Sequence, residues 1–347
     1  MDLNSLVNKI DIKQEKENKP LDTYIENKNR EKLETLLSEF LSIINDETAP
    51  YLWPAIGVEE YYDYINGKIN NFDFNIESID LSADNLPQYN IIRDNNNENI
   101  KFGLFLSALI NNAVNGEKTK IKTLIPIDYL FYNLENAEAY VNTAGKYLGK
   151  EAKNSRIYAD EAKDYPGLYV ENCELHVKKA NNSLGDNAKN SSIYANEAGN
   201  SAGFGMKVCE LHVRKAGNYL GNKAEKSKIY AYEVGNRAGW DMQECELHVR
   251  KAGEYLGTGA KNSRVYADEA GNGAGKFMQN SKLFIYELKG KLDESCLTGN
   301  NEIYLGKESY EKFPEYRGKV KIWEKNTVEN ALKGVPVDIQ DRNKSRY

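Results

Sequence analysis

An 18-residue repeat is the feature of this sequence that most restricts how the chain can fold. Aliphatic residues recur every 18 positions and define position one of each unit: Ile157, Leu175, Ile193, Leu211, Ile229, Leu247, Val265 and Leu283. Two further steps backward reach Ala139 and Ile121. Position eleven is glycine in eight consecutive units: Gly149, Gly167, Gly185, Gly203, Gly221, Gly239, Gly257 and Gly275. Residues 121–288 therefore form structurally equivalent units without insertions.

Each unit contains one short segment with the periodicity of a β-strand. The phrases I-Y-A and L-H-V alternate apolar, amphipathic and apolar residues. A glycine in every unit suits a sharp turn with positive φ, whereas helical repeats usually have units of more than thirty residues. The pattern predicts a mainly β protein, a single-stranded parallel β-helix (β-solenoid) of 18-residue coils about 4.8 Å apart.

A second period of 36 residues indicates which positions face the interior. Coils with Ala at position three carry Val or Met at position fourteen, namely Val170, Met206, Met242 and Met278. Coils with Val at position three carry Ala there, namely Ala152, Ala188, Ala224 and Ala260. Position ten alternates in the same way between Leu and Ala. A narrow core of constant cross-section requires such volume compensation, so positions three, ten and fourteen are predicted to be interior.

Positions two and five are expected to face outward. Position two alternates tyrosine with histidine, which accounts for the abundance of tyrosine, 24 residues in all. Position five alternates in charge from Glu161 through Lys179 and Glu197 to Glu269. Stacked coils would place these side chains above one another, so alternating signs form weak ion pairs and fix the register.

The flanking segments divide the chain into four predicted regions. Residues 1–20 read as a disordered arm, 21–118 as a mixed α/β cap, 119–290 as the β-helix and 291–347 as a C-terminal cap and tail. Within the N-terminal cap, helices are predicted near 29–45, 58–65 and 102–114, and a β-segment near 72–81. The cap is expected to cover the open edge of the first coil.

The repeat resembles the GXGXG-type β-helix domain. The segments YANEAGNSAGFGM (194–206) and YADEAGNGAGKFM (266–278) carry its A-G-x-x-M phrase. The glycine pair that follows methionine in that family is replaced here at Cys209, Cys245 and Ser281. The domain occurs in the large chain of glutamate synthase and in one of the chains of archaeal formylmethanofuran dehydrogenase. The resemblance covers residues 121–288 and implies a structural scaffold, because the redox chemistry of those enzymes resides in other domains or subunits.

The histidines and cysteines do not have the spacing of a metal or disulfide site. His176, His212 and His248 are 36 residues apart, as are Cys173, Cys209 and Cys245. Members of either set would lie about 9.6 Å apart in the stack. Zinc thiolates must approach to roughly 4 Å, and a disulfide needs Cα atoms within about 7 Å. We therefore predict no metal ligands and no cofactor, and expect buried free thiols of the kind found in a reducing compartment.

Other site classes find little support in the columns. A polysaccharide-lyase site needs converging acids, but Asp160 and Asp268 are six coils apart. The basic pair Lys178–Lys179 recurs every second coil, yet acidic coils such as that of Glu197 lie between its copies, and the net charge is −6. We therefore expect no nucleic-acid partner. The longest apolar run, residues 102–110, is too short to cross a bilayer, and no signal peptide is visible.

The interpretation that remains is a cytoplasmic, non-catalytic scaffold or docking protein. An accessory subunit of a formylmethanofuran-dehydrogenase-like or glutamate-synthase-like redox complex is the alternative, and a carbohydrate-active enzyme is the second alternative. A protein partner or a second copy of the chain could use the aromatic column at position two. That predicted face comprises Tyr158, His176, Tyr194, His212, Tyr230, His248 and Tyr266.

Overall fold

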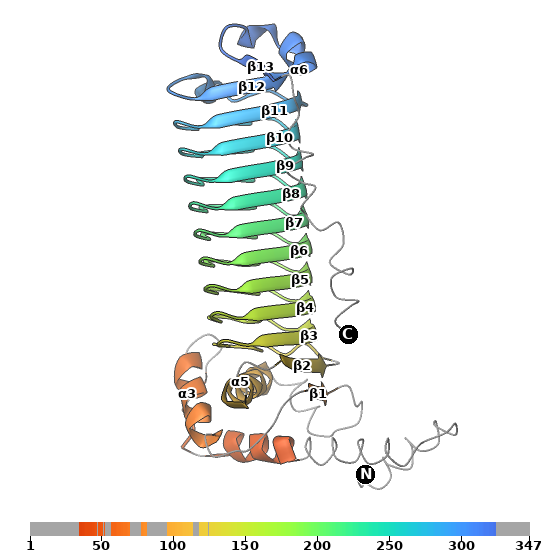
Figure 1. Ribbon diagram of the computed structural model, residues 1–347, viewed down its shortest axis with the longest axis vertical. Coiled ribbons are helices and arrows are strands. Elements are labelled where there is room, and N and C mark those ends of the chain that lie inside the picture. The colour runs from red at the N-terminus through yellow and green to blue at the C-terminus, as the bar shows by residue number, and fades with distance from the viewer. Residues whose placement is uncertain are drawn as a thin grey trace, which may run out of the picture.

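The computed structural model describes residues 35–46, 48–50, 52, 57–69, 78–81, 96–113, 118–123 and 125–323. Thirteen strands form one sheet in which spatial order follows chain order, and neighbouring strands are parallel. Figure 1 shows them stacked into a straight rod, with helices at its N-terminal end and a small cap at the other. The predicted β-solenoid with a mixed N-terminal cap is confirmed.

Nine strands of seven residues each make up the regular part of the rod. They are β3 (Glu138–Ala144), β4 (Arg156–Ala162), β5 (Glu174–Ala180), β6 (Ser192–Ala198), β7 (Glu210–Ala216), β8 (Lys228–Val234), β9 (Glu246–Ala252), β10 (Arg264–Ala270) and β11 (Lys282–Leu288). Register partners are 18 residues apart, as in Ile157 opposite Leu175 and His176 opposite Tyr194. From β3 to β11 the columns read from the sequence therefore exist as stacks in space. The backward step to Ile121 is wrong: Ile121 lies opposite Val141, Thr119 lies opposite Ala139, and two extra residues separate this strand from β3.

The interior of the rod contains the residues that the volume argument placed there. The coil with the small Ala195 at position three contains Met206 at position fourteen. The next coil contains Val213 and Ala224 at the same two positions. All four side chains are buried, and Met206, Val213 and Ala224 completely. Each coil thus fills a similar cross-section with a different distribution of volume.

Left-handed backbone conformations shape the turns between strands. The eight glycines of position eleven have φ between +63° and +78°, as predicted. A Cβ atom on Gly221 would lie 2.3 Å from Cδ1 of Ile229, so the glycine also makes room for the next position-one side chain. Positions nine, thirteen and sixteen are left-handed as well, and most of their residues are not glycine. Position sixteen carried a signal in its recurrent asparagines that the sequence reading did not use, whereas positions nine and thirteen are mixed and include tyrosine, lysine and glutamate, which carry no left-handed signature.

The N-terminal cap combines helices with the first two strands. Residues 35–44 are helical, followed by α3 (Val58–Ile69), β1 (Ser78–Leu81), α5 (Asn96–Ala113) and β2 (Lys118–Thr123). Within the described residues the three predicted helices and the β-segment are confirmed. Residues 1–34 and 70–77, which include the predicted arm and parts of two predicted elements, lie outside the described residues.

The α5 helix begins six residues earlier than its apolar run predicts. Its polar first turn is held by Asn99, whose Nδ2 donates to the Pro126 carbonyl at 3.0 Å and whose Oδ1 accepts from the Asp128 N–H at 2.8 Å. Phe102 of the same helix packs on Phe40, with ring centroids 4.9 Å apart. The helix is thereby fixed against both the solenoid and the rest of the cap.

Beyond β11 the stack continues with irregular spacing. It contains η1 (Glu294–Leu297), β12 (Glu302–Gly306), α6 (Lys307–Lys312), η2 (Pro314–Tyr316) and β13 (Lys321–Trp323). Register partners are now 20 residues apart between β11 and β12 and 17 apart between β12 and β13. The 18-residue period ends near residue 288 as expected, but the sheet itself extends past both ends of the predicted 119–290 region.

Candidate functional site

An aromatic ladder runs along the outer face of the sheet. It consists of the stacked rings of Tyr140, Tyr158, His176, Tyr194, His212, Tyr230, His248, Tyr266, Phe284 and Tyr304. Neighbouring centroids are 4.4–5.3 Å apart and the ring planes differ by 7–18°. The strand spacing and the parallel register impose this stacking. All seven residues of the predicted partner face belong to the ladder.

Each histidine of the ladder is held by a carboxylate two residues earlier on the same strand face. The Nε2 atoms of His176, His212 and His248 lie 2.6, 2.8 and 2.6 Å from glutamate Oε1 atoms. These acids are Glu174, Glu210 and Glu246. Burial lowers the pKa of His248, although its carboxylate partner acts in the opposite direction. A tyrosine ring lies between successive histidines, so the three imidazoles do not converge.

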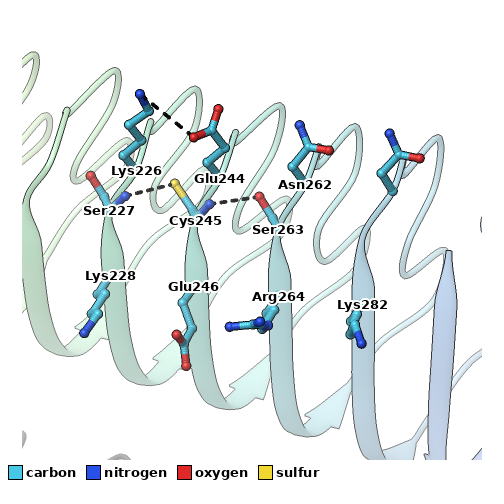
Figure 2. A pocket seen from close by; sticks show the side chains of 11 residues that line it. Lys226, Ser227, Lys228, Glu244, Cys245, Glu246, Asn262, Ser263, Arg264 and Lys282 are labelled. Carbon is cyan, nitrogen blue, oxygen red and sulfur yellow. Dashed lines mark hydrogen bonds and ion pairs between the residues drawn. The ribbon is translucent and has the colours of Figure 1, made fainter. Parts of the chain in front are cut away.

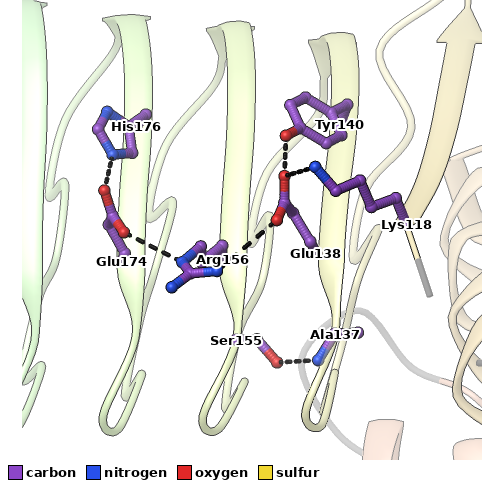
Figure 3. Close-up of polar contacts among 8 residues, drawn as sticks. All are labelled: Lys118, Ala137, Glu138, Tyr140, Ser155, Arg156, Glu174 and His176. Carbon is purple, nitrogen blue, oxygen red and sulfur yellow. Dashed lines mark hydrogen bonds and ion pairs between the residues drawn. The ribbon is translucent and has the colours of Figure 1, made fainter. Parts of the chain in front are cut away.

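The carboxylates of this column also join an ion-pair network near the N-terminal end (Figure 3). Arg156 lies between Glu138 and Glu174, at 3.8 and 3.3 Å. Lys118 Nζ closes the network 3.1 Å from Glu138 Oε1. Burial alone would raise the pKa of Glu174, but the hydrogen bond with His176 and the charge of Arg156 bring it below its ordinary value. A shallow groove of about 500 Å³ follows these residues.

A second shallow groove, of about 370 Å³, lies in the same strip of the rod closer to the C-terminal end (Figure 2). Its floor is a ladder of small polar side chains that link successive coils. The Ser227 N–H donates to Cys245 Sγ at 3.4 Å, and the Cys245 N–H donates to Ser263 Oγ at 3.0 Å. Position seventeen thus supplies acceptors for backbone N–H groups that would otherwise be buried without partners.

The cysteine thiols, three in this ladder and one in η1, are poor nucleophiles. All four cysteines are free and buried. Burial raises the pKa of Cys245 to about 11 and that of Cys296 to about 12. A reactive cysteine needs a lowered pKa, which comes from a nearby cation or imidazole. The grooves therefore lack the activated nucleophile of a cysteine enzyme, and their polar atoms serve the fold.

The predicted acidic and basic columns are stacked, but they do not bring several acids together at one point. Asp160 is paired with Lys178 at 2.6 Å, and Asp268 belongs to β10, six strands away from Asp160. In column five, opposite charges are register partners. Among the described residues, however, Lys251 and Glu269 are the one pair of this column whose charged atoms lie within 4 Å, at 3.9 Å. Long, largely exposed side chains gain little by closing such contacts. From Glu161 to Glu269 the alternation therefore acts mainly by avoiding like charges, whereas the next step places Glu269 opposite Glu287.

The ladder is less exposed than its outward orientation suggested. Tyr158 is 2% exposed, His176 3%, His248 6% and His212 8%. The other three members of the predicted face, Tyr194, Tyr230 and Tyr266, are half-buried. The expectation of an exposed tyrosine column is therefore wrong for most of its length. That the ladder binds a partner stays a prediction.

A different group of aromatic residues occupies the turns. The turn-edge cluster, as we call it, consists of Tyr219, Arg237, Trp240, Tyr255, Lys276 and Phe277. The Arg237 guanidinium lies 4.9 Å from the Trp240 ring centroid and donates a hydrogen bond to the Tyr219 hydroxyl. Phe277 is 60% exposed. Reading single columns could not find this cluster, because its residues come from positions nine, twelve and thirteen of different coils.

Among the residues that the structure describes, no three His, Cys, Asp or Glu side chains form a group that could hold a metal ion. No helix of the described part is both long and apolar enough to span a membrane. Comparison with known proteins found no matching family model, no matching curated protein and no matching solved structure. The resemblance to the GXGXG-type β-helix domain therefore stays a prediction.

Proposed function

We propose that this protein is a non-catalytic docking scaffold whose turn-edge cluster binds a partner protein through an acidic segment. The observation that carries the proposal is the composition of the cluster. Tyrosine, tryptophan and arginine dominate the binding energy of protein interfaces. Here Tyr219, Arg237 and Trp240 are held together by the fold before any partner arrives, so little conformational freedom is lost on binding.

Charge complementarity supports an acidic partner. Arg237 and Lys276 face aromatic rings, and in the described part of the chain neither forms an ion pair. Carboxylates of a partner could therefore reach both cations without displacing an existing salt bridge. Sugar binding is less well supported, because Trp240 is already covered by Arg237 and stacks on Tyr219 at 5.6 Å. The four buried free thiols fit a reducing, cytoplasmic setting.

Site-specific photo-crosslinking tests the proposal. The purified protein carries a photoreactive phenylalanine analogue at Phe277 or, as the control, at Val208, which is 56% exposed at position sixteen, outside the cluster. Each form is irradiated in a lysate of the source organism and its adducts are identified. We expect an adduct with a protein that bears an acidic segment from position 277 but not from position 208. Arg237→Glu should abolish it, whereas Arg250→Glu on β9 should not.

Two other outcomes are informative. The same adducts from both positions, or none from Phe277, would overturn the proposed docking surface. Adducts with oxidoreductase subunits would identify the scaffold as the accessory subunit of a redox complex, which is the alternative raised by the sequence resemblance. In that case the charge dependence at Arg237 should still hold, because its guanidinium forms no ion pair in the described part of the chain.

A further inference from the structure

The low exposure of several rings in the aromatic ladder is not explained by stacking alone. Stacking hides the two faces of a ring but leaves its outer edge accessible. A second stack on the turns illustrates this: Tyr147 lies between Tyr129 and Tyr165 at 4.6 and 5.3 Å, yet it is only half-buried. Tyr158 and His176 in the ladder are only 2% and 3% exposed. Something beyond the neighbouring rings covers their edges.

Trp323 indicates where that cover begins. It is the last residue of β13, at the C-terminal end of the rod, but its indole reaches back along the outer face. Its ring centroid lies 5.6 Å from that of Phe284 and 6.4 Å from that of Tyr266, with ring planes tilted by 58° and 50°. It is 8% exposed and forms a hydrophobic cluster separate from the main core. A tilted indole placed over the stack covers ring edges that no member of the stack can reach.

We propose that the segment after Trp323, residues 324–347, docks on the aromatic ladder and covers it from Tyr266 toward Tyr158. This inference is independent of the turn-edge cluster. The segment is long enough: 24 residues can span about 80 Å when extended. The ladder from Tyr266 to Tyr158 comprises six strand steps, or roughly 29 Å.

The composition of the segment suits this surface. Leu332, Val335, Val337 and Ile339 provide apolar side chains within eight residues. They can pack on ring edges as Trp323 does. Three basic residues follow, Arg342, Lys344 and Arg346. The ladder offers them acids beside its histidines, of which Glu210 is 45% exposed at the side chain.

The three histidines make the proposal directly testable, because they are the only ones in the chain and all belong to the ladder. Diethyl pyrocarbonate modifies accessible neutral imidazoles, and the reaction is followed by absorbance. The test protein is the full chain with a specific protease site inserted directly after Trp323. We expect slow modification before cleavage. The fragment should remain bound after cleavage and elute with the rod on gel filtration.

A substitution in the intact chain provides the second arm. Leu332→Glu combined with Val335→Glu should release the segment and accelerate histidine modification at least tenfold. The matched control, Tyr165→Glu on the exposed turn stack, should leave the rate unchanged. A synthetic peptide of residues 324–347 should restore protection to the double variant, and a scrambled peptide should not.

The outcomes separate the possible covers. Equal histidine reactivity in the intact chain and the double variant would overturn the proposal. So would loss of the fragment on gel filtration while the histidines stay protected. Protection that depends on protein concentration and accompanies a doubled molar mass would assign the cover to a second copy of the chain instead. None of these results bears on crosslinking at Phe277, so the two proposals fail separately.

Discussion

Val208 is predicted to be a strained residue whose replacement stabilises the protein. It has φ +55° at position sixteen and, among the described residues with positive φ, it is the one whose side chain branches at Cβ. The same position holds asparagine in six other coils: Asn136, Asn154, Asn172, Asn190, Asn262 and Asn280. Asparagine tolerates left-handed backbone, whereas a β-branched residue there is an outlier.

The expected gain follows from the backbone and the exposed fraction. A left-handed conformation costs an ordinary L-residue about 1–2 kcal/mol, and asparagine recovers part of that. Val208 is 56% exposed, so little apolar burial is lost when it is replaced. We expect Val208→Asn to raise the free energy of unfolding by about 1 kcal/mol. The reverse change at the exposed Asn190, which has φ +49°, should lower it by a similar amount.

Urea denaturation followed by circular dichroism measures both effects. With a slope of about 3 kcal/mol per molar, each substitution shifts the midpoint by roughly 0.3 M in opposite directions. The slope itself should not change, because neither variant alters the surface exposed on unfolding. If Val208→Asn and Asn190→Val both leave the midpoint unchanged, position sixteen does not impose the left-handed cost and the reasoning is refuted.

Three further predictions concern the turns, the thiol ladder and the histidines. Gly221→Ala should destabilise the protein by about 2–5 kcal/mol, since φ is +65° and the new Cβ meets Ile229 at 2.3 Å. The control Gly299→Ala, with φ +72° and nothing within 4 Å, should cost only about 1–2 kcal/mol in the same urea assay. Cys245→Ala removes the sulfur that accepts from the buried Ser227 N–H at 3.4 Å and should cost about 1–3 kcal/mol. Cys245→Ser keeps an acceptor and should cost clearly less, so equal urea midpoints for the two variants would contradict this prediction. Burial lowers the folded pKa of His248, so the unfolded chain binds the proton more readily and stability should fall as pH drops below the ordinary value of 6.5. His248→Phe should reduce that loss, and an unchanged pH dependence in the variant would refute the assignment.

The architecture could be predicted because the repeat constrains every coil in the same way. Met206 and Ala224 were assignable to the interior from their alternation alone, and the position-eleven glycines from their regularity. The pairing of Glu174 with His176 was also visible in principle, since residues two apart on a strand share a face. Position eighteen passed unnoticed although glutamate recurs there every second coil, as in Glu174 and Glu210, because the site search compared residues within single columns and not across neighbouring ones.

The burial of the ladder could not be predicted from the repeat. It depends on residues outside the repeat, as the contact of Trp323 with Phe284 shows, a separation of 39 residues after the 18-residue period has ended. The register also changes there, to steps of 20 and 17 residues, and no column rule anticipates it. Local periodicity determines which side of a strand a residue faces, but not what covers that side.

The informative positions of a solenoid are those at which a column departs from its own rule. Stacking places equal residues about 4.8 Å apart, and chemistry that needs several different groups at one point cannot arise within a uniform column. Arg237 stands in a column that holds Tyr219 and Tyr255 on either side, and it is this substitution that creates the turn-edge cluster. Val208 breaks the asparagine column in the same way and leaves an apolar side chain exposed. A search for function in this rod should therefore begin with the exceptions, since the repeated residues are accounted for by the requirements of stacking.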